Sequence, residues 1–166
     1  GIVTKPFTFE ARVRMENAIG GIDKLRDNVD TLIVIPNDKL LSIVDRRTSF
    51  RDAMKVADEV LQQAVRGITS IIYTPMDINL DFRDVRNVME DKGLAHIGIG
   101  EGQGDDKAKQ AVQQAVSSPL LETDIAGASD VLVSISGDIT LYDVNDIQEY
   151  IVEKVGDQAN VIMGEL

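Results

Sequence analysis

Asp30-Thr31-Leu32-Ile33-Val34-Ile35-Pro36-Asn37-Asp38 is the stretch that decides the fold class of this chain. Residues 31–35 form an unbroken run of apolar and β-branched side chains, which is typical of a strand buried on both faces of a parallel sheet. The Pro-Asn-Asp sequence that follows is a turn signal and ends the strand. Because a buried parallel strand needs helices on both faces of its sheet, the sequence predicts an α/β fold.

The segments on either side of this strand alternate between strand and helix patterns. We expect further strands at residues 1–4, 94–100, 130–136 and 160–164, and helices at residues 9–28, 39–44, 50–73, 82–92, 106–116 and 143–155. The order is α/β throughout, with no internal repeat, low-complexity run or flexible linker. Since the chain starts within a strand and stops just after one, we expect that both ends were cut from a longer protein.

The longest expected helix runs from Phe50 to Tyr73. Ser49 precedes it and forms a capping-box pattern with Asp52. At 1.5 Å per residue the helix is about 35 Å long, enough to cross a domain. Its apolar residues occupy a broad arc, which indicates burial on more than one side, as between two domains.

Composition excludes several classes of function. The 166 residues carry a formal net charge of −11, which argues against binding to nucleic acid or to an anionic membrane. There is no cysteine, so thiol catalysis and thiolate metal sites are excluded. His96 is the single histidine, and we expect it to lie within a strand rather than in a catalytic triad. No apolar stretch approaches the roughly 18 residues of a membrane span, so we expect a cytoplasmic protein without direct membrane insertion.

Two carboxylates three residues apart, Asp81 and Asp84, open the helix expected at residues 82–92. Side chains with this spacing project from one face of a helix. The partial positive charge of a helix N-terminus favours their ionised forms. Such a pair is suited to orienting a water molecule or holding a cation. The alternative is structural, with Asp81 as the N-cap and Asp84 as an ordinary first-turn acid.

The glycine-rich stretch Gly98-Ile99-Gly100-Glu101-Gly102-Gln103-Gly104 resembles a phosphate-binding loop only superficially. Its spacing fits neither the dinucleotide-binding motif nor the P-loop motif. Its acidic residues would also repel phosphate. We therefore interpret it as the edge of a strand followed by a turn.

Several blocks of sequence together resemble the tubulin/FtsZ family of GTPases. The blocks lie in the order in which the family has them, cover essentially the whole chain, and comprise residues 2–10, 30–38, 79–85, 97–100 and 117–122. The resemblance implies that residues 1–48 are the end of a Rossmann-like GTP-binding domain and residues 49–76 are a long central helix. Residues 77–166 would form most of a C-terminal α/β domain with a mixed sheet.

The resemblance also implies a function. Members of the family bind GTP or GDP with Mg²⁺ and stack head to tail into protofilaments at the mid-cell division site, together with other division-ring proteins. The loop from Asn79 through Asp81 to Asp84 would reach the γ-phosphate held by the neighbouring subunit and promote its hydrolysis. We therefore assign these three residues as catalytic. We assign no residue as a metal ligand.

Five further positions match nucleotide-binding positions of the family. Glu10 matches the glutamate at the ribose, Arg14 the arginine near the phosphates, and Asn37 an asparagine after the buried strand. Asp58 matches the aspartate that binds guanine, and Met54 stands where the family usually has a stacking phenylalanine. The residues alone favour a structural alternative, in which Glu10 and Arg14 form an i,i+4 ion pair and Asp58 is a solvated acid on a helix.

The chain departs from the family pattern at other positions. Ala11 replaces a usual glycine, and Arg83 replaces a usual alanine between the two acids. The glycine-rich phosphate loop and the N-terminal GTP-binding segment that carries it have no counterpart in these residues. We therefore expect the chain by itself not to hydrolyse GTP. Two hypotheses follow: it is part of a polymerising GTPase, or it is a non-catalytic interaction module that caps filament ends.

Overall fold

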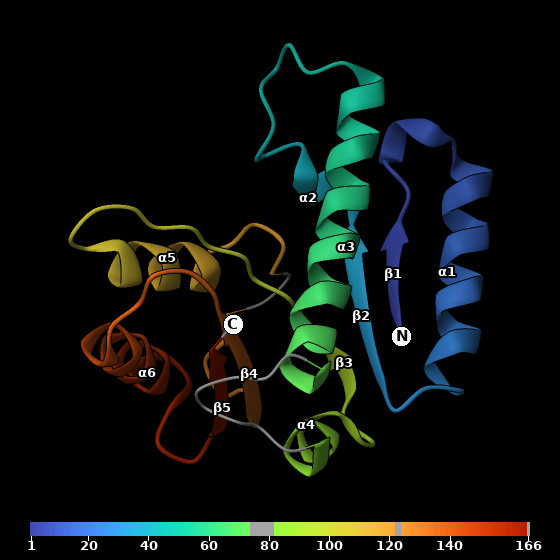
Figure 1. Ribbon diagram of the computed structural model, residues 1–166. Helices are drawn as coiled ribbons and strands as arrows, with labels where there is room; N and C mark the ends of the chain where they lie inside the picture. Colours follow the sequence, from blue (N-terminus) through green and yellow to red (C-terminus); the bar gives the residue numbers. More distant parts are fainter. Residues whose placement is uncertain (74–81, 122–123, 166) are drawn as a thin grey trace. The chain divides into compact units, whose positions relative to one another are not determined.

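The computed structural model describes residues 1–73, 82–121 and 124–165 and has an α/β fold (Figure 1). Asn79 and Asp81 lie outside the described residues. The elements in chain order are β1 (Ile2–Lys5), the 3₁₀ helix η1 (Thr8–Glu10), α1 (Arg12–Arg26), β2 (Thr31–Pro36), α2 (Asn37–Leu40), α3 (Phe50–Tyr73), α4 (Phe82–Met89), β3 (Gly93–Ala95), α5 (Lys107–Val116), β4 (Asp130–Ile135), α6 (Leu141–Val155) and β5 (Asn160–Glu165). No helix among the described residues is long and apolar enough to cross a membrane.

The chain folds into two compact units. The first contains Gly1–Arg66 and Met89–Ile97, and the second contains Gly67–Val88 and Gly98–Leu166. Neither unit is one continuous stretch of sequence. The division into residues 1–48, 49–76 and 77–166 stays a prediction.

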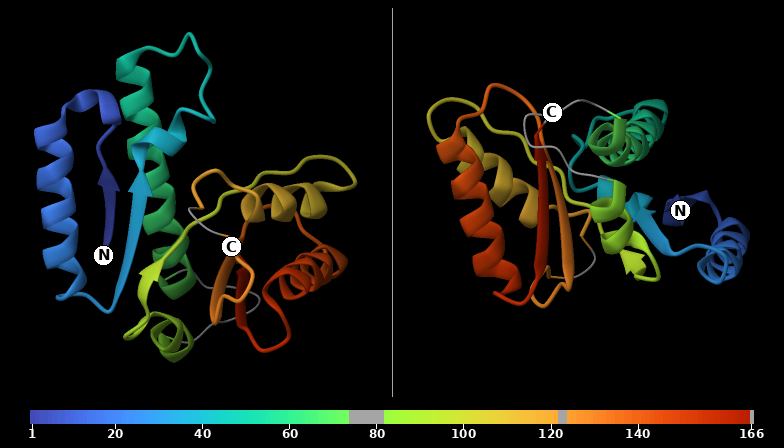
Figure 2. Two further views of the ribbon diagram at one scale, coloured as in Figure 1. Left: turned by 180° about the vertical axis from the view of Figure 1, so that it is seen from behind. Right: turned by 60° about the horizontal axis from the view of Figure 1, so that its bottom comes forward.

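A three-stranded parallel sheet in the order β1-β2-β3 forms the centre of the first unit. Every residue from Thr31 to Ile35 in the central strand is buried, as the apolar run predicts. Leu32 and Val34 pack against Ile22 of α1. The helix α1 and the first part of α3 lie on opposite sides of the sheet (Figure 2), which explains why neither face of β2 carries exposed polar residues.

The second unit contains the parallel pair β4–β5, with Asp130 opposite Asn160. Helices α5 and α6 pack on one face of this pair through a cluster of apolar residues. The buried members of the cluster are Ala108, Val112, Ile147, Ile151 and Val155. Within the described part of the chain this sheet has only parallel strands, so the antiparallel strand that a mixed sheet requires is not among these residues.

Two helices begin with a side-chain cap, and the cap predicted at Ser49 is confirmed. The Ser49 hydroxyl donates to the Asp52 carboxylate at 2.6 Å and accepts from the Asp52 N–H at 3.2 Å, at the start of α3. At the start of α6 the backbone N–H and the hydroxyl of Thr140 both donate to the Asp143 carboxylate at 2.8 Å. The hydrogen bonds lower the pKa of each aspartate, that of Asp52 mainly through the Ser49 hydroxyl and that of Asp143 mainly through the Thr140 N–H.

The glycine-rich stretch packs directly on a helix and does not form a phosphate loop. A Cβ atom added at Gly98, Gly100 or Gly102 would lie 2.1 Å, 1.9 Å and 1.8 Å, respectively, from a carbonyl oxygen of α5. The Glu101 N–H between these glycines donates to the Gln114 side chain at 2.8 Å. The alternate glycines therefore let the chain lie against the backbone of α5.

Four sequence predictions of element boundaries are wrong in part. The helix predicted at residues 9–28 is interrupted at Ala11, whose φ of 97° is incompatible with a helix, and α1 begins only at Arg12. The helix predicted at 39–44 is α2, which ends at Leu40; its Asp38 carboxylate does not cap it but accepts from the N–H of Thr8 at 2.9 Å.

The other two boundary errors flank β3. The helix predicted at 82–92 ends at Met89, and Asp91 then adopts a left-handed conformation with a φ of 55°. The strand predicted at 94–100 is limited to Gly93–Ala95, which pairs with β2, because the following glycines contact α5 instead of a strand. His96 is exposed and lies just beyond the end of this strand, not within a strand as we expected.

Candidate functional site

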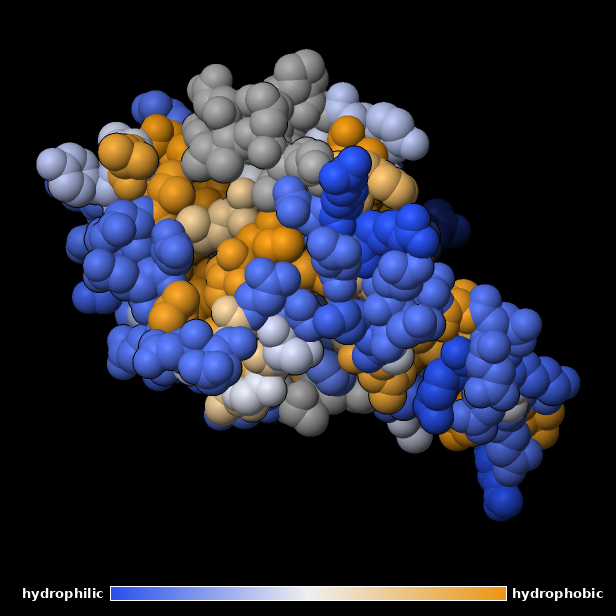
Figure 3. Space-filling model, turned by 90° about the horizontal axis from the view of Figure 1, so that it is seen from below, coloured by the Kyte–Doolittle hydropathy of each residue, from blue (hydrophilic) through white to orange (hydrophobic). Residues whose placement is uncertain are grey.

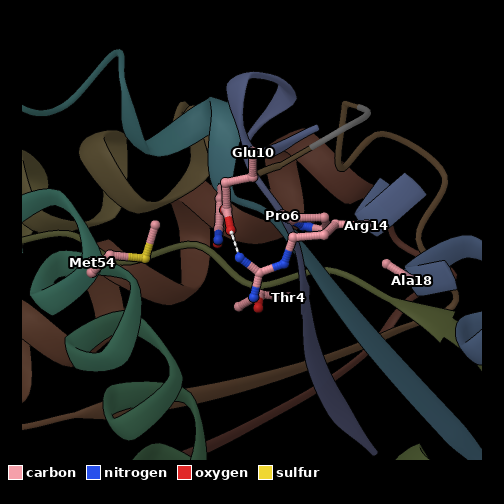
Figure 4. A pocket seen from close by; sticks show the side chains of 7 residues that line it. Thr4, Pro6, Glu10, Arg14, Ala18 and Met54 are labelled. Atoms are coloured by element: carbon pink, nitrogen blue, oxygen red, sulfur yellow. Dashed lines mark ion pairs between the residues drawn. The ribbon is translucent and has the colours of Figure 1, made fainter. Parts of the chain in front are cut away.

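An open cavity of about 320 Å³ lies in the first unit, where the carboxyl ends of β1 and β2 meet (Figure 4). In open α/β sheets, ligands bind at the carboxyl ends of the strands. The residues that line the cavity come from β1, the turn after it, η1, α1, α2 and α3. They are Thr4, Pro6, Glu10, Arg14, Ala18, Asn37 and Met54.

An ion pair between Glu10 and Arg14 lies on one side of the cavity. The Oε2 atom of Glu10 is 3.0 Å from Nη1 of Arg14, and the two side chains point toward one another in Figure 4. The Oε1 atom of Glu10 accepts the Phe7 N–H at 2.8 Å. The Glu10 side chain is only 10% exposed, whereas that of Arg14 is 70% exposed. The carboxylate is therefore held in place while the guanidinium can still reach a ligand.

Asn37 contributes a buried polar atom to the cavity wall. The residue is 5% exposed, and its Oδ1 atom is the one buried side-chain oxygen or nitrogen in the described ranges that has no hydrogen-bond partner. Leaving a buried acceptor unpaired destabilises a fold by about 1–3 kcal/mol. Such an atom needs an explanation, and a ligand that donates a hydrogen bond from the cavity supplies one.

Helix α3 provides the opposite wall of the cavity through Met54, which is half-buried. Asp58 lies one helical turn further along α3 and is exposed. It lines a second open cavity of about 270 Å³ together with Lys55, Glu59 and Gln62. Four of the five predicted nucleotide-binding residues thus surround one cavity, and Asp58 lines the other.

Family models match both ends of the chain. Residues 1–45 match the GTPase domain of the tubulin/FtsZ family, and residues 93–166 match the C-terminal domain of the FtsZ family. The chain is 47% identical over 99% of its length to the cell division protein FtsZ of Magnetospirillum gryphiswaldense and 49% identical over 98% to FtsZ 1 of Thermococcus kodakarensis.

The chain belongs to the tubulin/FtsZ family. The resemblance that the sequence blocks indicated is therefore confirmed. The alignments cover 30% of the Magnetospirillum protein and 44% of the Thermococcus protein, so the chain spans less than half the length of these curated relatives.

Solved structures of the tubulin/FtsZ family confirm the α/β fold. The fold matches the empty FtsZ dimer of M. jannaschii with a TM-score of 0.94 and 43% identity, over 99% of this chain and 48% of that chain. It also matches the GDP-bound monomer of CetZ1 from Haloferax volcanii with a TM-score of 0.76, over 100% of this chain and 49% of that chain. At 18% identity the second match bears on the fold alone.

Of the three predicted catalytic residues, Asp84 is the one that lies within the described residues. It lies in the first turn of α4 and is half-buried. Asn79 and Asp81 lie outside the described residues, so the three catalytic predictions stay predictions. The described residues contain no group of three or more His, Cys, Asp or Glu side chains that could hold a metal ion.

Sequence reasoning missed three residues that line the cavity, namely Thr4, Pro6 and Ala18. None of them carries a charge or a chemical signature that marks a binding site. Their position in the sheet, just at or after the end of β1, is the signal that locates Thr4 and Pro6. Ala18 lies one helical turn after Arg14 and therefore shares its face of α1.

The protein surface carries exposed hydrophobic side chains among many hydrophilic ones (Figure 3). In the first unit Phe9 and Phe50 are 57% and 60% exposed, and their rings are in edge-to-face contact with centroids 5.8 Å apart. In the second unit the neighbouring residues Leu141 and Tyr142 are both more than 80% exposed. Exposed apolar groups of this size favour association with other chains when they form patches.

Proposed function

We propose that this chain is part of a GTPase that binds GTP or GDP in the cavity at the carboxyl ends of β1 and β2. The unpaired Oδ1 atom of Asn37 is the observation that carries the proposal. A guanine nucleotide offers base N–H groups and ribose hydroxyls, each of which is a hydrogen-bond donor for such an oxygen.

The other residues around the cavity support the same ligand. The guanidinium of Arg14 is exposed. A guanidinium group is suited to binding phosphate oxygens because it can donate two parallel hydrogen bonds to them. The thioether of Met54 packs favourably against aromatic rings and would contact the base. The Asp58 carboxylate accepts hydrogen bonds from guanine N1 and N2, whereas adenine has no donor at these positions. We therefore expect binding of GTP to be stronger than binding of ATP.

We further propose that subunits associate head to tail and that hydrolysis occurs between them. Asn79, Asp81 and Asp84 would act on the nucleotide of the neighbouring subunit, where ionised carboxylates orient the attacking water. Mg²⁺, when bound with GTP, would neutralise phosphate charge. A head-to-tail contact does not close on itself, so it propagates a filament. The division site in the cell is where such a filament would act, together with division-ring proteins.

The full-length gene product tests the proposal. We expect calorimetry to detect binding of GTP and GDP that is about tenfold or more tighter than binding of ATP, because Asp58 is left unpaired by adenine. Sedimentation should show GTP-dependent filaments. The rate of phosphate release per subunit should rise with protein concentration, because hydrolysis requires two neighbouring subunits. Binding without hydrolysis or sedimentation would favour the filament-capping module. Equal affinities for GTP and ATP would contradict the assignment of Asp58.

A further inference from the structure

We propose that Ala11 is a positioning residue for the candidate nucleotide site: its strained backbone sets where Glu10 and Arg14 meet, and it lowers the fraction of molecules that are ready to bind. This inference rests on the proposed function. Ala11 joins η1 to α1, so it lies between the two charged residues of the cavity along the chain.

The backbone of Ala11 adopts a conformation that only glycine populates readily. Its φ is 97° and its ψ is 145°. An L-residue with a Cβ atom is strained in this region, and such strain persists only where the surrounding structure enforces it. Asp91 is the one other residue besides glycines, in the part of the chain that the structure describes, with a positive φ. Its φ of 55° lies in the left-handed region that aspartate tolerates.

Contacts on both sides of Ala11 enforce the strain. On the helix side, the Ala11 carbonyl accepts the N–H groups of Arg14 at 3.1 Å and Met15 at 3.3 Å. On the η1 side, the Glu10 carboxylate accepts the Phe7 N–H at 2.8 Å and pairs with Arg14 at 3.0 Å. Rotation of Ala11 to a negative φ would therefore swing residues 7–10 relative to α1.

The swing would separate the carboxylate of Glu10 from the guanidinium of Arg14. Molecules thus divide between a strained conformation, in which the pair is formed beside the cavity, and a relaxed one, in which it is broken. The apparent dissociation constant of a ligand rises in inverse proportion to the fraction of binding-competent molecules. A glycine at position 11 would remove the strain and increase that fraction.

The test compares Ala11→Gly, Ala11→Val and Asp91→Gly in the full-length gene product, with GDP as the probe. By calorimetry we expect the dissociation constant of GDP to fall about three- to tenfold in Ala11→Gly and to rise in Ala11→Val, because a β-branched residue tolerates a positive φ least. Asp91→Gly likewise places glycine at a position with a positive φ, but Asp91 does not line the cavity, so this control should leave GDP affinity unchanged.

A double-mutant cycle distinguishes positioning from general stabilisation. If Ala11 acts through Glu10, Ala11→Gly should give no gain in GDP affinity in a Glu10→Ala background. The inference is overturned if Ala11→Gly raises the melting temperature while the GDP affinity stays the same, or if the gain persists without Glu10. If the wild type does not bind GDP, the proposed function is wrong. In that case hydrogen exchange alone tests the role of Ala11. The Phe7 amide should exchange more slowly in Ala11→Gly than in the wild type, and an unchanged rate overturns the inference.

Discussion

Two residues beside the cavity are each in a state that destabilises the free protein. Asn37 buries an amide oxygen without a donor, and Ala11 adopts a backbone conformation suited to glycine. Proteins break local rules of this kind mainly at functional sites, where a ligand or a mechanism compensates. Both residues lie in the first unit, and they point to the same cavity from independent physical arguments.

Replacing Asn37 by leucine should separate stability from binding. Leucine has the same branched arrangement of heavy atoms and no polar atoms, so removing the unpaired oxygen should leave the melting temperature of the nucleotide-free protein unchanged or raised. The affinity for GDP should fall by about tenfold, equivalent to about 1.4 kcal/mol, through loss of one hydrogen bond. Calorimetry and thermal melts with and without GDP measure both effects.

Ser118 provides a matched control for Asn37. It is 7% exposed, and its hydroxyl accepts the N–H of Leu120 at 3.3 Å. Because this buried oxygen has a partner, Ser118→Ala should destabilise the protein by about 1 kcal/mol without affecting GDP binding. A lower melting temperature for Asn37→Leu combined with unchanged GDP affinity would show that Asn37 is structural.

At the scale of elements, helix starts and glycine contacts determine where the segments begin and how closely they pack. Helices α3 and α6 both begin with a hydroxyl residue and an aspartate three positions later that cap each other. The stretch after β3 uses glycine at alternate positions to approach α5. The helix caps and the glycine contacts each lead to a prediction about stability that does not depend on the proposed function.

The cap of α6 should make stability depend on pH. Because the Thr140 N–H holds the pKa of Asp143 below the ordinary value of about 3.9, the charged cap stabilises the fold fully above that pH. The stabilisation is lost as the pH falls through the lowered pKa. Asp143→Asn should therefore have a lower melting temperature than the wild type at pH 7, and the difference should shrink below about pH 4.

Melting curves between pH 7 and pH 3 test this expectation. Asp146→Asn is the control, because it removes an exposed carboxylate from the same helix without affecting the cap. A difference between wild type and Asp143→Asn that stays constant down to pH 3 would mean that the charge of the cap contributes nothing.

Two substitutions of glycine by alanine should have opposite effects on stability. A Cβ at Gly100 would lie 1.9 Å from the carbonyl oxygen of Ala111, so Gly100→Ala should destabilise the protein by about 3 kcal/mol through overpacking. Gly20 lies within α1, and an added Cβ has no atom within 4 Å. Gly20→Ala should stabilise by about 1 kcal/mol through helix propensity. Urea denaturation measures both, and equal effects would contradict the packing argument.

Sequence patterns predicted the elements whose signals are local. The apolar run at residues 31–35, the bounds of α3 and the capping box at Thr140 were all predictable from periodicity and side-chain chemistry. The break at Ala11 was not, because alanine favours helix and only the surrounding contacts impose a positive φ. Nor was the end of β3, since the glycines that follow it serve a contact with a helix that comes later in the chain.

The candidate site was predictable to a different degree. The nucleotide-binding assignments of Glu10, Arg14, Asn37 and Met54 came from resemblance to the tubulin/FtsZ family, and their convergence on one cavity follows from the parallel sheet. The residues themselves favoured an ion pair between Glu10 and Arg14, and the structure contains that pair. No pattern in the sequence marks the Asn37 oxygen as unpaired, because its surroundings depend on the packing of several elements.

At the scale of the whole molecule, the candidate nucleotide cavity and Asp84 belong to different compact units. Along the chain, most of α3 lies between Met54 in the wall of the cavity and Asp84. In the proposed function, one subunit binds the nucleotide by itself, whereas hydrolysis requires two neighbouring subunits. The net charge of −11 disfavours association through nonspecific contacts, so head-to-tail assembly requires a specific interface.

Substitution of Asp58 and of Asp84 in the full-length gene product should therefore give complementary defects. Asp58→Ala should weaken GTP binding by about 10- to 100-fold, through loss of hydrogen bonds to a charged acceptor. Asp84→Ala should abolish hydrolysis and leave GTP affinity nearly unchanged, because Asp84 would act only on the nucleotide of a neighbour. Asp157→Ala, which removes an exposed carboxylate from the turn before β5, controls for the change in charge.

Mixing the two variants gives the decisive measurement. In a mixed filament, the intact loop of an Asp58→Ala subunit would face the GTP bound to an Asp84→Ala neighbour, so the carboxylate missing from one subunit is supplied by the other. Phosphate release from an equimolar mixture should then exceed the mean of the two variants measured separately, under conditions in which sedimentation shows that they assemble together. The excess should disappear when the double variant Asp58→Ala/Asp84→Ala replaces either partner, because no subunit then supplies the missing function. A mixture that releases phosphate no faster than this mean, despite co-assembly, would mean that Asp84 does not act across the interface.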